Sequence, residues 1–111
     1  MGNYTNWTEE EFKAYLLIYA SESNYEVTIE EKELIDFSFD EQIIDKIKSE
    51  VNNLNDYQKS QIIVEYIKLK KYDQNQLNKL LDEVKNMYEI DGQFDLYEQS
   101  IFNMLKKLLK V

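Results

Sequence analysis

Four carboxylates crowd into one short stretch of this chain and have the chemistry to bind a divalent cation. They are Glu89, Asp91, Asp95 and Glu98. Carboxylate oxygens are the hard ligands that Ca²⁺ and Mg²⁺ prefer. A calcium-binding loop in this register would place the soft thioether of Met87 at its first position, where a carboxylate is required. The spacing therefore argues against a conventional calcium hand and leaves a less regular divalent-metal site as one hypothesis.

The same acidic residues have a structural interpretation. Asp95 is followed three positions later by Glu98. This is the capping-box pattern, in which two side chains bond free backbone N–H groups at a helix start. Capping explains both residues without any metal. We therefore keep both hypotheses and prefer helix capping.

The residue types that most catalytic chemistry needs are missing. The 111 residues include no His and no Cys, and all 13 positive charges belong to Lys. This composition excludes disulfides, thiolate and imidazole metal sites, and Cys- or His-based catalysis. With only two Gly, a glycine-rich phosphate loop is excluded as well. We expect a protein that is not an enzyme and has no cofactor beyond the divalent cation considered above.

Negative charge is concentrated in the first half of the chain. The formal net charge is −9, and residues 1–50 hold 13 Asp and Glu against 4 Lys. An acidic chain repels a nucleic-acid backbone, so we expect a protein partner and no nucleic acid. The acidic half is either a set of solvated helix faces or a surface that contacts a basic partner. For the second interpretation, the candidate interaction residues are Glu22, Glu26, Glu30 and Glu33.

Helices must position these side chains, and the sequence marks six helix starts. A Ser, Thr, Asp or Asn followed three residues later by Glu or Gln stands before each of six apolar, periodic segments. The six pairs are Thr8/Glu11, Thr28/Glu31, Ser38/Glu41, Asn55/Gln58, Asp73/Gln76 and Asp95/Glu98. Scarce Gly and absent Pro also favour helices over strands.

The predicted fold is all-α, with about six helices in one compact bundle and a single domain over residues 1–111. The predicted helices span about 9–22, 29–37, 41–53, 56–71, 74–89 and 96–109. The segment 56–71 is apolar over the widest arc, which predicts a central position. No apolar run approaches the roughly 18 residues of a membrane span, and no signal-peptide pattern is present. We expect a cytoplasmic protein with no membrane insertion.

Two helix–helix connections share one sequence pattern. Residues 22–31 and 89–98 align without a gap, each with an apolar residue after the turn, then a capping residue, then a Glu three positions later. Glu31 is therefore the counterpart of Glu98, and Thr28 is the counterpart of Asp95. Gly92, the only internal Gly, supplies the left-handed conformation that ends a helix.

This duplicated unit near both ends of a helical domain resembles the TerB-like tellurite-resistance family, to which the N-terminal domain of a membrane-anchored DnaJ co-chaperone is related. The resemblance covers Phe12 to Leu109. It implies the TerB-like fold, a role in stress or tellurite resistance through protein–protein assembly, divalent-metal binding by loop acids, and no enzymatic activity. The first copy departs from the pattern, because Asn24 and Tyr25 replace its Asp-Gly pair.

Two functions follow from these observations. The first is a non-enzymatic TerB-like helical module that acts through protein interaction in a bacterial stress or tellurite-resistance system, with weak divalent-metal binding as an additional property. The alternative is an acidic immunity or antitoxin-type protein that neutralises a basic toxin. Complementary charge speeds and orients such an encounter, and the acidic half motivates this second hypothesis.

Overall fold

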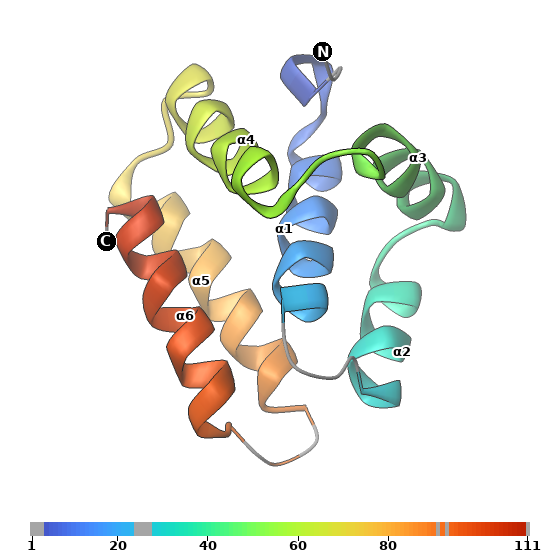
Figure 1. Ribbon diagram of the computed structural model, residues 1–111, viewed down its shortest axis with the longest axis vertical. Helices are drawn as coiled ribbons and strands as arrows, with labels where there is room; N and C mark the ends of the chain where they lie inside the picture. Colours follow the sequence, from blue (N-terminus) through green and yellow to red (C-terminus); the bar gives the residue numbers. More distant parts are fainter. Residues whose placement is uncertain (1–3, 24–27, 91, 93, 111) are drawn as a thin grey trace.

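Six α-helices make up most of the chain in the computed structural model, which describes residues 4–23, 28–90, 92 and 94–110 (Figure 1). The elements are η1 (Tyr4–Asn6), α1 (Glu9–Ser23), α2 (Ile29–Ser38), α3 (Glu41–Val51), α4 (Asp56–Leu69), α5 (Gln74–Tyr88) and α6 (Leu96–Leu109). The described ranges contain no strand, and none of their helices is long and apolar enough to cross a membrane. The predicted all-α fold of about six helices is confirmed.

Five of the six predicted capping pairs mark real helix starts. At α1, the Glu11 N–H donates to Thr8 Oγ1 at 3.1 Å and the Thr8 N–H donates to Glu11 Oε1 at 2.9 Å. Thr28 likewise accepts a bond from the Glu31 N–H. Complete capping boxes begin α4, α5 and α6, at Asn55/Gln58, Asp73/Gln76 and Asp95/Glu98. These bonds satisfy donors that a helix start otherwise leaves unpaired.

The Ser38/Glu41 prediction was wrong. Ser38 is the last residue of α2, and Phe39, with extended backbone angles, follows it. Asp40 is the residue that precedes α3, and its side chain makes no capping bond. As the last residue of α2, Ser38 has a helical backbone, whereas an N-cap needs an extended one. Ser38 therefore does not cap α3.

The central helix is α1, and the prediction that residues 56–71 would be central was wrong. In α1, Phe12 and every residue from 14 to 21 are buried, and the helix packs against α2, α3 and α5. Figure 1 shows α1 running through the middle of the bundle. By contrast, α4 buries only Ile62, Ile63 and Tyr66, and it leaves Leu69 half exposed. A wide apolar arc therefore does not by itself predict a central position, because the neighbouring helices determine how much of that arc is covered.

Aromatic contacts fix α4 against α1. The rings of Phe12 and Tyr66 stack with centroids 4.1 Å apart, and the Tyr66 hydroxyl donates to the Trp7 carbonyl at 2.8 Å. Trp7 is buried, and its indole N–H donates to Glu50 on α3 at 3.2 Å. The segment before α1 therefore ties α3 and α4 to the central helix.

Truncation of α1 tests its central position. We expect Leu16→Ala to lower the free energy of unfolding by about 2–5 kcal/mol, because Leu16 is 1% exposed and its loss leaves a cavity. The matched control is Leu69→Ala on α4, where we expect a change within about 0.5 kcal/mol. Urea denaturation followed by circular dichroism measures both. Equal losses in the two variants would contradict this packing.

Candidate functional site

The loop between α5 and α6 holds the four predicted metal ligands. Glu89 is exposed at the end of α5, and its N–H donates to the Lys85 carbonyl. Gly92 has φ +85° and donates to the Glu89 carbonyl at 2.9 Å, as expected for a residue that ends a helix. Asp91 lies outside the described residues.

Asp95 and Glu98 are engaged in capping. The Glu98 N–H donates to Asp95 Oδ1 at 2.7 Å, and the Asp95 N–H donates to Glu98 Oε1 at 3.3 Å. Glu98 is 2% exposed, whereas Glu89 and Asp95 are on the surface. Within the described part of the chain, no group of three or more acidic side chains is arranged to hold a metal ion. The four-carboxylate metal site stays a prediction.

Glu98 meets its own counterpart in the interior. Glu31, the equivalent residue of the first helix–loop–helix unit, is 1% exposed and is hydrogen-bonded to Glu98 through the two side chains. Each glutamate occupies the third position of its helix, so each carboxyl group turns back toward the helix start. The sequence alignment paired these residues, but it did not reveal that they touch.

The surroundings of the buried pair favour a proton on one of the two carboxyl groups. Burial, followed by the hydrogen bond and the negative charge of Glu98, raises the pKa of Glu31 to about 7. Glu31 Oε2 is buried and has no hydrogen-bond donor among the described residues. Two ionised carboxylates cannot bond each other, because each only accepts hydrogen bonds. A proton on one carboxyl group supplies the missing donor. The Ser21 hydroxyl adds a longer bond to Glu31 Oε1, at 3.4 Å.

A buried tyrosine borders this pair. Tyr88, at the end of α5, donates its hydroxyl proton to the Ala20 carbonyl of α1 at 2.6 Å. Burial, and then the nearby Glu31 and Glu98 charges, raise the pKa of Tyr88 far above its usual value. The phenol stays neutral and holds the end of α5 against α1.

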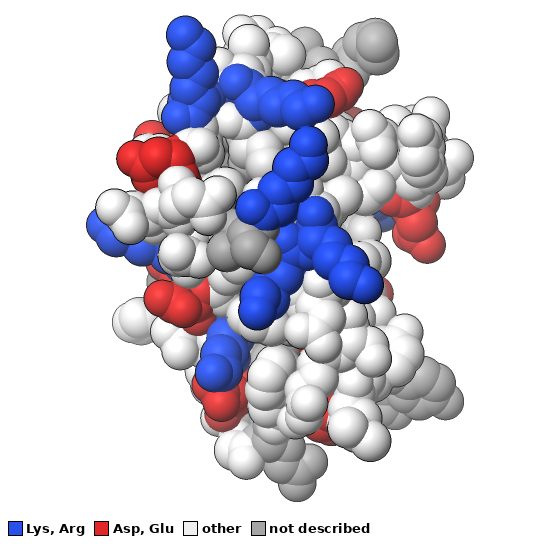
Figure 2. Space-filling model, turned by 90° about the vertical axis from the view of Figure 1, so that its left-hand side faces the viewer, with Lys and Arg blue, Asp and Glu red and all other residues white. Residues whose placement is uncertain are grey.

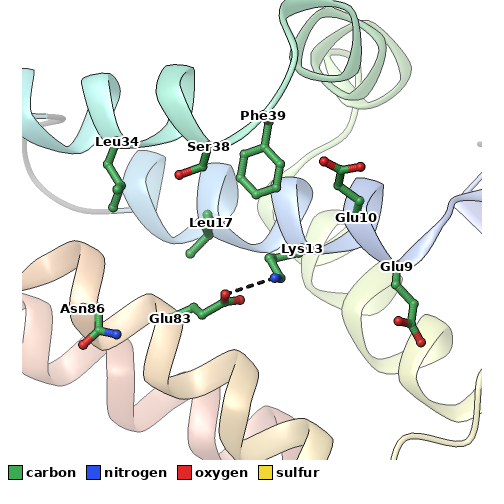
Figure 3. Close-up of a pocket in the computed structure, with 9 residues that line it drawn as sticks. All are labelled: Glu9, Glu10, Lys13, Leu17, Leu34, Ser38, Phe39, Glu83 and Asn86. Atoms are coloured by element: carbon green, nitrogen blue, oxygen red, sulfur yellow. Dashed lines mark ion pairs between the residues drawn. The ribbon is translucent and has the colours of Figure 1, made fainter.

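A second feature opens to solvent as a groove of about 590 Å³ between α1, α2 and α5. Figure 3 shows Leu34, Ser38 and Phe39 reaching from α2 and its end, opposite Glu83 and Asn86 from α5. The apolar floor consists of Leu34, which is partly buried, and of Leu17 and Phe39, which are 5% and 6% exposed. Three glutamates and one lysine, Glu9, Glu10, Glu83 and Lys13, form the rim.

The rim of the groove is more acidic than basic. Lys13 is the only positive charge that lines it, and its Nζ lies 3.0 Å from Glu83 Oε1. Glu9 and Glu10 are exposed and have no ion pair within the described residues. The groove therefore presents uncompensated negative charge above an apolar surface.

The predicted interaction residues are divided between two places. Glu30 and Glu33 are exposed on α2. Glu30 lies one helical turn before Leu34, which places it beside the groove. Phe37 is 92% exposed and follows Leu34 by three residues. Glu22 instead lines a different hollow with Tyr19, Asp56 and Tyr97, and Glu26 lies outside the described residues.

Sequence reasoning missed the groove itself. Its rim comes from Glu9 and Glu10 on α1 and from Glu83 on α5, which are more than 70 positions apart in the chain. The only available signal was the acidic run at the start of α1, which also suits the positive end of a helix dipole.

Comparisons of this chain with protein-family models, with curated proteins and with solved structures give no significant match. The resemblance to the TerB-like family consequently rests on the duplicated loop pattern alone.

The metal and capping hypotheses make different predictions for Asp95. If the residue is a cap, Asp95→Ala should lower the free energy of unfolding by about 0.5–2 kcal/mol with or without metal. We expect the melting temperature of the wild type to be the same in millimolar Ca²⁺, Mg²⁺ or Mn²⁺ as in a chelator. A rise of several degrees that disappears in Asp91→Ala would instead establish a metal site.

The carboxyl pair predicts a characteristic pH dependence. Because the pKa of Glu31 is about 7 in the fold and 4.5 ordinarily, its contribution to stability is full below pH 4.5 and is lost as the pH rises through about 7. Glu31→Gln keeps the capping geometry and supplies a permanent donor. We expect this variant to be more stable than the wild type at pH 8 and to depend less on pH.

Glu30→Gln is the matched control, because it removes the same charge from an exposed neighbour. Urea midpoints between pH 5 and pH 8 measure the difference. Above pH 5, Glu11 stays ionised, since its hydrogen bond from Lys46 lowers the pKa of Glu11. A control that flattens the profile as much as Glu31→Gln would assign the effect to net charge.

Proposed function

We propose that this protein is a non-catalytic helical module that binds a basic segment of a protein partner in the groove between α1, α2 and α5. The observation that carries this proposal is an acidic rim above an apolar floor. Glu9, Glu10 and Glu83 attract cationic side chains, and Leu17 with Phe39 receives an apolar one. The composition supports a non-catalytic role, because the chain has no His and no Cys.

The chemistry of the groove specifies the ligand. It suits a short segment in which an apolar side chain is flanked by Lys or Arg. Burial of the apolar side chain supplies the non-directional part of the affinity. The rim charges accelerate the encounter and orient the segment, and this contribution weakens as salt rises. The exposed Glu30, Glu33 and Phe37 of α2 extend the same kind of surface beyond the groove.

The TerB-like resemblance supplies the biological setting of the proposal. It suggests a bacterial stress or tellurite-resistance system in which the module assembles with other proteins, and the duplicated loop unit supports it. An immunity-type protein is the second candidate, because an acidic groove also suits a basic toxin. A neighbouring gene for a basic toxin favours the second setting, and a tellurite-resistance gene cluster favours the first.

A labelled peptide tests the groove directly. The probe is a short peptide with one Leu flanked by lysines, and its counterpart carries Glu in place of each Lys. We expect the lysine peptide alone to bind, with an affinity that falls as salt rises. Glu9→Gln combined with Glu10→Gln should weaken binding several-fold, because two attractions are lost. Fluorescence anisotropy measures the affinity.

Asp45→Asn on α3 is the matched control, since Asp45 is exposed and does not line the groove. It should leave the affinity unchanged. Equal binding of both peptides, or equal losses in the groove variant and the control, would refute the groove as the binding site.

A further inference from the structure

Lysines gather on a face of the molecule that the proposed function leaves unused. Figure 2 shows them clustered on the side where, in Figure 1, the end of α6 lies beside the connection between α4 and α5. A bond of 3.5 Å from Gln74 Nε2 to the Lys110 carbonyl joins the start of α5 to the end of α6. Lysines are concentrated at these two helix ends, and all six are exposed: Lys68, Lys70 and Lys71 at the end of α4, and Lys106, Lys107 and Lys110 at the end of α6.

Among the described residues, these six lysines have no ion pair with a carboxylate. The ion pairs of the described residues use Lys13, Lys32 and Lys46, and none uses the six lysines at the ends of α4 and α6. Cations are favoured at helix C-termini by the helix dipole, which accounts for part of the pattern. It does not account for two helix ends that place their lysines on one surface of a chain with net charge −9.

One segment of this face combines positive charge with an exposed apolar side chain. Residues 68–71, here called the basic corner, read Lys-Leu-Lys-Lys. Leu69 is 53% exposed, although it ends a helix whose other large apolar residues are mostly covered. An apolar side chain flanked by lysines is the chemistry that the acidic-rimmed groove requires.

We propose that the partner of the groove is a second copy of this chain, which inserts its basic corner. Leu69 of one copy then lies against Leu17, Leu34 and Phe39 of the next, and the flanking lysines face Glu9 and Glu10. This inference rests on the proposed function of the groove. The corner and the groove are different surfaces, so each contact leaves one of each free, and the copies associate head to tail.

A second copy fits this face better than a membrane surface or a nucleic acid does. Both of those are extended polyanions, whereas the basic corner is a patch of four residues that includes an exposed leucine. The face has no Arg, so it lacks the planar fork that binds phosphate in two places. A second copy offers negative charge and an apolar floor together, at the scale of a few side chains.

Charge reversal in complementary pairs tests the contact. We expect the mean mass of the wild type, from sedimentation velocity, to rise with concentration in low salt and to fall toward the monomer in high salt. Lys68→Glu with Lys70→Glu reverses the corner, and Glu9→Lys with Glu10→Lys reverses the groove. Each variant alone should associate at least about tenfold more weakly, because attractions become repulsions. An equimolar mixture should recover association, since each variant's corner then meets a groove of opposite charge.

Two further variants separate charge from fold and from general stickiness. Lys68→Gln with Lys70→Gln weakens association without adding acids to a helix C-terminus, and circular dichroism verifies that it folds. Leu69→Ser should weaken association at every salt concentration. Leu96→Ser, at a residue that is 80% exposed on α6, is the matched control and should have no effect.

The peptide probe distinguishes failure of this inference from failure of the proposed function. A wild type that binds the lysine peptide yet stays monomeric at every salt and protein concentration overturns the self-association and leaves the groove intact. A wild type that neither binds the lysine peptide nor self-associates overturns both proposals. Association that survives in both reversed variants places the contact elsewhere. Binding to vesicles of anionic lipid or to duplex DNA that Lys68→Glu with Lys70→Glu abolishes, without self-association, assigns the corner to that surface instead.

Discussion

The packing of α2 in the bundle depends on a contact between two buried glutamates, Glu31 and Glu98. Each of Glu31 and Glu98 is the third residue of a capped helix, and capping turns the side chain back toward the helix start. Because the chain uses this unit twice and packs the two copies together, the equivalent carboxyl groups meet in the interior. Two buried like charges are costly, so the contact is stable only when one carboxyl group keeps a proton.

This pair matters most for α2. The helix has only two buried residues, Glu31 and Ile35, so one of its two anchors in the core is the carboxyl group bonded to Glu98. The same helix carries Leu34 toward the groove, and Phe39 follows at its end. The position of Leu34 and Phe39 in the groove therefore depends in part on the hydrogen bond between the two glutamates and on the packing of Ile35. A buried polar contact inside the bundle thus helps to shape the surface proposed to bind a partner.

The sequence predicted what short-range chemistry decides and missed what packing decides. Helix starts such as Asn55 and Asp73 were predictable, because a cap involves residues three positions apart. Ser38 had the same spacing without being a cap, since an identical pattern fits the end of one helix as well as the start of the next. The groove joins Glu9 to Glu83, and no local pattern encodes that proximity. The loop alignment paired Glu31 with Glu98, but only the packing of α2 and α6 against α5 brings the two side chains together.

The two acidic features of the molecule are linked through α2. A ligand that rests on Leu34 and Phe39 favours the position of α2 seen here, and that position is the one in which Glu31 is hydrogen-bonded to Glu98. Linkage is reciprocal: a ligand bound in the groove favours protonation of the glutamate pair, and protonation of the pair favours binding of that ligand. Burial, followed by the hydrogen bond and the charge of Glu98, raises the pKa of Glu31 to about 7. The buried pair therefore keeps its proton below about pH 7 and loses it above that pH. Loss of that proton weakens the anchoring of α2 and, through the same linkage, weakens binding in the groove.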